Sequence, residues 1–439
     1  MSHRWSRLLS LLLVLTLVLC ACSKEKSAEE YFQDGQAYLE SGDVSKAISA
    51  LEEALKQDPG MAKAHRLLGE ALGRNEQWSE AITEFEAYQS LAQEDSVAYF
   101  LLGHAYAQVG QLEEASAAFA RGSEVDPSFL DTHQEEIAQV IDSIVQAGQA
   151  ALDAGDLETA TGLLNLIAPL APGQGQVYVL LGEAHLQAND TLQALDAFAN
   201  AVRLSPELLT ERAQEFQALA GSGLEMGRTA FESGDLETAI QVMRAVVELM
   251  PENVQAHFML GNAYNQANQL NQAIEAYESV LDLNPDSASA LTNMGVVYYK
   301  LGQLDTAIQK YNAALQIEPD DPETHYLLGA AYVQMDQLEQ GQSEFETALN
   351  LDEQLAPAYI GLGNVYLLQG KMDAALDTLE QAIELAPNSP EAYFALGQTY
   401  MQAGDTEKAR AALERVLELN PAPRWREQVE LMLESLDSP

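Results

Sequence analysis

Residues 391–421 read EAYFALGQTYMQAGDTEKARAALERVLELNP, and this stretch contains the pattern that decides the fold. Its glycine, Gly397, is followed three positions later by an aromatic residue, after twelve by a small one, after sixteen by a bulky one and after twenty-four by a proline. The same pattern surrounds Gly295. The glycines in this position are Gly35, Gly69, Gly103, Gly148, Gly182, Gly227, Gly261, Gly295, Gly329, Gly363 and Gly397. Repeats of about 20 to 50 residues are typical of a solenoid, which presents an extended surface rather than an enclosed catalytic pocket.

Each repeat is expected to fold as a helical hairpin, because apolar residues recur at spacings of three and four on both sides of a short break. The break carries a residue that ends a helix at little cost in a left-handed conformation. These residues are Gly42, Gly110, Gly155, Asn189, Gly234, Asn268, Gly302, Gly370 and Gly404. A proline, which lacks the backbone donor that continuation needs, closes the second helix. These prolines are Pro59, Pro127, Pro172, Pro206, Pro251, Pro285, Pro319, Pro387 and Pro421.

Within one hairpin, small residues are expected where the helices touch and bulky residues where gaps remain. Gly295 and Ala307 should let the two helices of their hairpin approach closely. Tyr298 and Tyr311 should fill the wider gaps towards neighbouring helices.

Two steps between successive glycines are longer than the others by about eleven residues, or about three helical turns. An insertion of that length extends a helix without rotating its apolar stripe away from the core. The first insertion keeps helical spacing at Ile137, Val140, Ile141, Ile144 and Val145. The second, at about residues 208–224, contains Gly221 and Gly223, which each cost about 1 kcal/mol in a helix interior and predict a break there. The long helices act either as joints or only as changes in the pitch of one solenoid.

Over residues 28–421 the order Gly, Tyr, Ala, bulky residue, Ala, Pro resembles the tetratricopeptide repeat (TPR) family, although single repeats depart from it. The departures are Tyr88 and Gly341 at small or alanine positions, and Gln93 and Glu353 at the closing proline. The resemblance implies an all-α, right-handed superhelical solenoid of about eleven helical hairpins with a C-terminal capping helix. The expected segments are repeats 1–3 at 28–127, repeats 4–5 with an extended first helix at 128–206, repeats 6–11 with an extended first helix at 207–421, and the cap at 422–439.

The first residues have the order of a secretory signal, with two arginines and then an apolar run from residue 8 to 19 that is too short for a transmembrane helix. Around Cys22 the sequence resembles the lipobox of bacterial lipoproteins, with Leu19 three positions before the cysteine and Ala21 directly before it. This implies removal of residues 1–21 and acylation of Cys22, with residues 22–27 as a short tether. Cys20 is the poorer acceptor because the bulky Leu19 precedes it. The expected location is extracytoplasmic, lipid-anchored to the bacterial membrane, and on the periplasmic side of the outer membrane if the host has two membranes.

The chain carries 22 basic and 67 acidic side chains, for a formal net charge of −45. Nucleic acid is therefore not an expected partner, because phosphate contacts need a basic stripe. Motifs for zinc, phosphate loops or nucleophilic serine are missing from the sequence, and its histidines are scattered over different repeats. We therefore expect no catalysis, cofactor, metal or small-molecule substrate.

In the TPR family the first helices of the repeats line a concave groove. Mapped onto this sequence, those positions predict a partner-binding groove formed by Phe32, Phe100, Phe258, Asn262, Asn265, Tyr299, Tyr326, Ile360, Asn364, Phe394 and Gln398. Rings supply buried area and amides pair with backbone groups, which suits a protein segment. The alternative is that the rings mainly pack on the adjacent repeat.

The resemblance to bacterial repeat lipoproteins suggests a lipid-anchored scaffold that binds proteins during assembly of an envelope complex, such as pilus, secretion, polysaccharide-export or outer-membrane machinery. The alternative is a receptor or holdase for peptides and unfolded segments. The expected partners are proteins, together with the membrane through the lipid anchor.

Overall fold

The computed structural model describes residues 26–419 and 423–437, and within them the regular elements are α-helices. The chain forms two compact units, Met1–Glu211 and Arg212–Pro439. The first contains α2 (Ala28–Glu40), α3 (Val44–Gln57), α4 (Ala62–Arg74), α5 (Trp78–Leu91), α6 (Ser96–Gln108), α7 (Leu112–Val125), α8 (Phe129–Thr132), α9 (Gln134–Asp153), α10 (Leu157–Ile167), α11 (Gly175–Gln187), α12 (Thr191–Leu204) and α13 (Leu208–Glu211).

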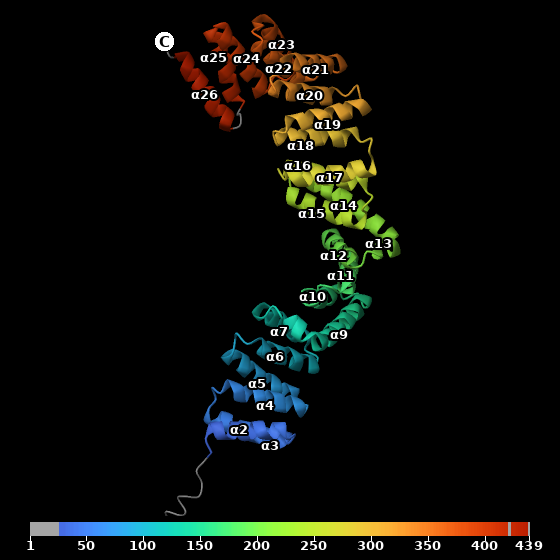
Figure 1. Ribbon diagram of the computed structural model, residues 1–439, viewed down its shortest axis with the longest axis vertical. Helices are drawn as coiled ribbons and strands as arrows, with labels where there is room; N and C mark the ends of the chain where they lie inside the picture. Colours follow the sequence, from blue (N-terminus) through green and yellow to red (C-terminus); the bar gives the residue numbers. More distant parts are fainter. Residues whose placement is uncertain (1–25, 420–422, 438–439) are drawn as a thin grey trace, which may run out of the picture. The chain divides into compact units, whose positions relative to one another are not determined.

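The second unit contains α14 (Ala213–Ser233), α15 (Leu236–Leu249), α16 (Val254–Gln266), α17 (Leu270–Leu283), α18 (Ala288–Lys300), α19 (Leu304–Ile317), α20 (Pro322–Gln334), α21 (Leu338–Leu351), α22 (Ala356–Leu368), α23 (Met372–Leu385), α24 (Pro390–Ala403), α25 (Thr406–Glu418) and α26 (Pro423–Asp437). In each unit, consecutive helices pair as hairpins that stack on one another (Figure 1). The all-helical repeat fold is therefore confirmed.

The core of each hairpin is a contact between the repeat glycine and the bulky residue sixteen positions later. A Cβ atom placed on Gly295 would lie 2.4 Å from Cε1 of Tyr311, and one placed on Gly69 would lie 2.4 Å from Cε1 of Phe85. The sequence predicts that Tyr311 fills a gap towards neighbouring helices, and it does share a cluster with Leu328 of α20. Its closest contact, however, is inside its own hairpin, where its ring fills the space that a side chain at Gly295 would need.

The turns inside the hairpins follow the sequence prediction. All nine expected residues have positive φ, from 59° at Asn189 and Asn268 to 81° at Gly42 and Gly234. Two repeats use residues that the pattern did not identify, Glu76 with φ 58° and Asp336 with φ 61°. The chain therefore accepts the left-handed conformation here even where a side chain makes it costly.

Most second helices end two residues before the expected proline, as α3 does at Gln57 ahead of Pro59 and α19 at Ile317 ahead of Pro319. The exception is α10, which ends at Ile167, five residues before Pro172. Pro421 lies outside the described residues.

In the part of the chain that is described, no helix is long and apolar enough to span a bilayer.

The two insertions share one local design, in which a one-turn helix is followed by a non-helical residue and then a long helix. In the first, His133 (φ −117°, ψ 27°) separates α8 from α9. Four of the five apolar residues predicted for α9 are buried and Val145 is partly buried, as expected. In the second, Arg212 (φ −114°, ψ 23°) precedes α14.

The predicted break at Gly221 and Gly223 is wrong, because α14 runs without interruption from Ala213 to Ser233. Phe216 and Leu219 are buried along this helix. Burying one large apolar side chain contributes about 2 kcal/mol, which offsets the helical cost of about 1 kcal/mol for each glycine.

Candidate partner-binding groove

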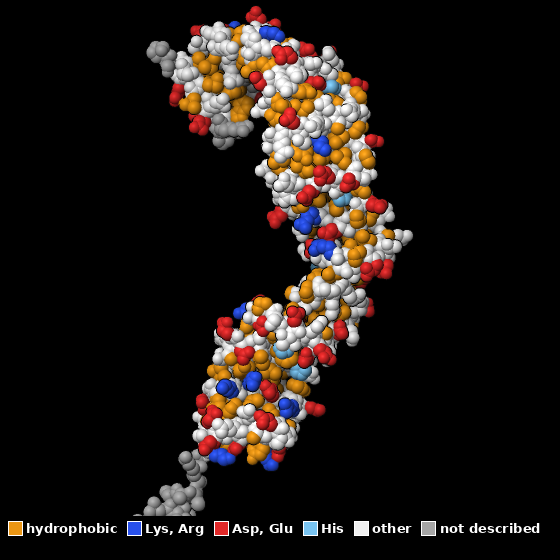
Figure 2. All heavy atoms as spheres, in the orientation of Figure 1, with side chains coloured by type: hydrophobic (Ala, Val, Ile, Leu, Met, Phe, Trp, Pro, Cys, Tyr) orange, Lys and Arg blue, Asp and Glu red, His pale blue; other side chains and the backbone are white. Residues whose placement is uncertain are grey.

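Two adjoining hollows lie along the first helices of the last repeats in the second unit. One, of about 470 Å³, is lined by residues of α18, α20, α21 and α22, together with Ser389 and Glu391 at the start of α24. The other, of about 820 Å³, is lined by residues of α22, α24 and the capping helix α26. Ile360, Asn364 and Glu391 belong to both hollows, so we treat them together as the C-terminal groove. Apolar side chains reach the surface over helices α20 to α26 in Figure 2.

The floor of the smaller hollow is an aromatic pair that glycines make possible. The rings of Tyr326 and Phe345 lie 6.0 Å apart between centroids. Phe345 also lies against α22, where a Cβ on Gly361 would stand 2.6 Å from its Cζ. Tyr326 is half-buried, so its ring both packs on the hairpin and faces the groove.

The wall of the larger hollow comes from the capping helix. Trp425 of α26 meets Phe394 of α24 edge to face, with centroids 4.8 Å apart and planes at 63°. Met432 of α26 lines the same hollow, together with Gln398 and Gln402 of α24. The cap therefore covers the end of the array and also completes the groove.

Glu391 is the one charged side chain among the described residues that line the C-terminal groove. It is exposed, and its Oε2 accepts a hydrogen bond of 2.9 Å from Ser389 Oγ. Burial raises the pKa of the Tyr326 phenol, and the nearby carboxylates of Glu323 and Glu391 raise this pKa further. Glu391 therefore gives this part of the groove a negative charge, which favours a cationic group on a bound partner.

Phe258, Asn262 and Asn265 lie earlier in the second unit and make contacts within their own hairpin or with the next repeat. Asn262 Oδ1 accepts hydrogen bonds from Tyr277 Oη at 2.6 Å and from Asn293 Nδ2 at 3.0 Å. Asn265 Oδ1 accepts one of 2.7 Å from the Lys300 ammonium. The Phe258 ring packs 5.9 Å from the ring of Tyr277. These three side chains therefore contact neighbouring helices and line neither hollow of the C-terminal groove.

The two remaining predicted rings lie in the first unit. Phe100 stacks on His133 with centroids 3.8 Å apart, so His133, which lies between α8 and α9, covers one face of the Phe100 ring. Phe32 lines a separate hollow of about 460 Å³ together with Lys63 and Arg66. That hollow has the opposite charge from the C-terminal groove, although Arg66 Nε also lies 3.7 Å from a carboxylate oxygen of Glu70.

Of the predicted site residues, the structure brings six together in the C-terminal groove: Tyr299, Tyr326, Ile360, Asn364, Phe394 and Gln398. The prediction missed Trp425 and Met432, because they follow the last repeat, where the glycine register gives no guide. It also missed Glu391, because one carboxylate is not conspicuous in so acidic a sequence. Cys22, the expected lipidation site, lies outside the described residues.

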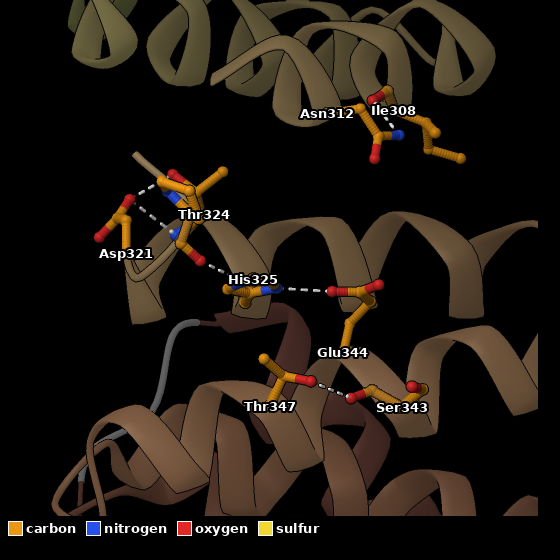
Figure 3. A network of polar contacts seen from close by, with 9 residues as sticks. Ile308, Asn312, Asp321, Thr324, His325, Ser343, Glu344 and Thr347 are labelled. Atoms are coloured by element: carbon orange, nitrogen blue, oxygen red, sulfur yellow. Dashed lines mark hydrogen bonds and ion pairs between the residues drawn. The ribbon is translucent and has the colours of Figure 1, made fainter. Parts of the chain in front are cut away.

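The histidines take part in packing networks. His325 Nδ1 lies 2.6 Å from Glu344 Oε2 and its Nε2 lies 2.9 Å from the Pro319 carbonyl oxygen (Figure 3). His65 makes the same pair of contacts in its own repeat. Across the described ranges, no three His, Cys, Asp or Glu side chains are grouped so that they could hold a metal ion.

Comparison with known proteins gives matches to tetratricopeptide repeat families along most of the array. A family described as TPR repeat matches residues 261–302 and 297–336. Families described as tetratricopeptide repeat match 366–428, 32–96 and 224–274, 320–388, and 96–129. The human PEX5-related protein is 27% identical over 187 residues, which is 40% of this chain and 28% of that protein. The chain thus matches less than a third of that relative.

Similar solved structures include a MamA protein, with 26% identity, 39% of this chain and 93% of that chain covered, and a TM-score of 0.34. A structure titled as the functional characterization of Pseudomonas aeruginosa pilF shows 17% identity, 50% and 99% coverage, and a TM-score of 0.43. YrrB, whose title describes a TPR protein with an unusual peptide-binding site, shows 22% identity, 43% and 97% coverage, and a TM-score of 0.34. The family matches together span more than half of the chain, which therefore belongs to the tetratricopeptide repeat family.

Proposed function

We propose that this TPR protein is an interaction scaffold that holds protein partners in the C-terminal groove while a lipid on Cys22 ties it to a bacterial membrane outside the cytoplasm, on the periplasmic side of the outer membrane if the host has two membranes. The observation that carries the proposal is the groove itself, in which apolar rings, amides and one carboxylate line two adjoining hollows. TPR proteins of this kind are generally non-enzymatic, and the proposed role makes and breaks no bond.

The mechanism is positioning at a surface. A scaffold anchored to a membrane confines the partners that it holds to that surface, and the effective concentration of tethered components reaches the mM range for short tethers. The tether expected here, residues 22–27, reaches about 20 Å at about 3.5 Å per residue. We propose assembly of an envelope complex as the process, since such machinery needs components held in register at a membrane.

A second candidate is a receptor or holdase for peptides and unfolded segments. The amides of Asn364, Gln398 and Gln402 favour it, because they stand beside the apolar rings and suit backbone groups of any extended chain. Breadth of binding separates the two candidates. A scaffold should retain one stable set of partners, whereas a receptor should bind many unrelated peptides weakly.

The test is crosslinking in the native host, followed by identification of captured proteins for the wild type and two variants. The double variant Tyr326→Ala with Phe394→Ala should lose the captured partners, because it removes one aromatic ring from each hollow. Phe258→Ala is the matched control, since this ring has the same place in its repeat but packs on Tyr277 outside the groove. Circular dichroism should show similar helicity for all three proteins. Partners that survive the double variant would show that the groove is the wrong surface.

A further inference from the structure

The C-terminal groove offers its two hollows on either side of a shared centre. Ile360, Asn364 and Glu391 line both hollows, with Tyr326 and Phe345 in the smaller one and Phe394 and Trp425 in the larger one. A segment lying across the centre would place one bulky apolar side chain in each hollow. The residue between them would stand near the Glu391 carboxylate.

The charge at this centre is negative and comes from Glu391, which lies in the first turn of α24. Among the described residues, no Lys or Arg pairs with Glu391, and its carboxylate instead accepts the hydrogen bond from the hydroxyl of Ser389. Glu323 adds a second carboxylate near Tyr326. A cationic side chain placed here donates a charge-assisted hydrogen bond to the carboxylate. It also gains from the faces of the surrounding rings, which attract Lys and Arg.

The net charge of the whole chain also favours a cationic partner. Its formal net charge of −45 attracts a basic segment and slows the approach of an acidic one. The hollow in the first unit differs, since Lys63 and Arg66 line it. The preference for a cation is therefore a property of the C-terminal groove and not of every hollow along the array.

We infer that the C-terminal groove recognises a protein segment in which a Lys or Arg lies between two bulky apolar residues, with Glu391 holding the cation. This inference rests on the proposed function, because it names the chemistry of the partner that the groove would hold. The amides of Asn364, Gln398 and Gln402 then pair with the backbone of the bound segment.

The test uses the full chain carrying Trp5→Phe and Trp78→Phe, which leaves Trp425 in the groove wall as its one tryptophan. The probes are three peptides with blocked ends and the sequence SGFSXSLGS, in which X is Lys, Gln or Glu. In an extended segment Phe, X and Leu share one face. Titration is followed by Trp425 fluorescence and, independently, by anisotropy of dye-labelled peptide.

The Lys peptide should bind about tenfold tighter than the Glu peptide, with the Gln peptide between them, as expected for a charge-assisted contact. Glu391→Gln should bring the three affinities to within about twofold of one another. Glu339→Gln is the matched control, because it makes the same charge change on an exposed part of α21 outside the groove, and it should keep the preference.

Each other outcome overturns a definite part of the inference. Equal affinities for the three peptides in the parent protein would remove the cation preference and leave groove binding intact. A Lys preference that persists in Glu391→Gln would assign it to the general charge of the chain instead of Glu391. Absence of binding by all three peptides, with no change in Trp425 fluorescence, would reject the inference, whereas the crosslinking experiment with the Tyr326→Ala, Phe394→Ala variant decides the proposed function separately. A change in Trp425 fluorescence with protein concentration, in the absence of peptide, would indicate that a second copy of the chain occupies the groove. That result would overturn the inference.

Discussion

The contact between the repeat glycine and the bulky residue sixteen positions later predicts how a Gly→Ala substitution changes the stability of the protein. Gly295 lies against Tyr311, whereas Gly221 lies on an exposed part of α14, where an added Cβ would have no heavy atom within 4 Å. The same substitution should therefore have opposite effects at the two positions, because helix propensity favours alanine at both but space is available at only one.

Gly295→Ala should lower the free energy of unfolding by about 1 to 3 kcal/mol, as overpacking usually does. Gly221→Ala should raise it by about 1 kcal/mol through helix propensity alone. Chemical denaturation of both variants, followed by circular dichroism, measures the two effects. If Gly295→Ala proved as stable as the wild type, the close contact with Tyr311 would not be what selects glycine.

Tyr311 also gives a dependence on pH. Burial raises the pKa of its phenol above the ordinary value of 10.0, and the neighbouring Tyr299 and Tyr326 raise this pKa further. The unfolded chain ionises first, so this contribution to stability is complete below about pH 10 and declines as the pH rises above that value. Tyr311→Phe should remove this loss, and phenylalanine already holds the equivalent place at Phe85 and Phe345.

The measurement compares denaturant midpoints of the wild type and Tyr311→Phe at about pH 8 and about pH 11. Near neutral pH the two proteins should be close in stability. At the higher pH the wild type should lose more stability than the variant. Equal losses would show that other groups dominate the alkaline behaviour.

At the scale of the helix and its turn, the left-handed backbone conformation decides which residue types are favourable, whether or not the repeat pattern shows a glycine there. Glu76 occupies the left-handed turn between α4 and α5 with φ 58°. Glu76→Gly should raise the free energy of unfolding by about 1 kcal/mol, because a residue with a Cβ pays about this amount in the left-handed region. Thermal or denaturant unfolding measures the gain.

Gly302→Ala provides the reverse experiment. Gly302 has φ 73° and no atom within 4 Å of an added Cβ, so strain in the backbone is the only cost. This variant should lose about 1 kcal/mol. A stabilising effect of Gly302→Ala, or none of Glu76→Gly, would contradict the assignment of strain to these turns.

The helices and turns were largely predictable because each repeat restates the same local requirements. Gly42 and Asn189 are residue types that predict a left-handed turn, whereas Glu76 is not. The uninterrupted α14 could not be foreseen, because the tertiary packing of Phe216 and Leu219 outweighs the low propensity of its glycines. Of the groove, Tyr326 and Phe394 follow from the repeat register, but the contribution of Trp425 depends on how the cap docks.

At the scale of the whole molecule, the proposal of a lipid anchor depends on one atom, the sulfur of Cys22. Cys22→Ala should move the protein from the membrane fraction to the soluble fraction in its host, because acylation is what holds it there. Cys20→Ala is the control, and this variant should stay with the membrane. Fractionation followed by immunoblotting measures both, and membrane retention of Cys22→Ala would contradict the anchor.

Repeat arrays change in length when a hairpin is duplicated or lost, and the cap limits where this chain can do so. Trp425 and Met432 form a wall of the larger hollow opposite Phe394, which belongs to the last repeat. A hairpin inserted between α25 and α26 would separate that wall from Phe394 and dismantle the hollow. An added hairpin that leaves the groove intact must therefore lie nearer the N-terminus.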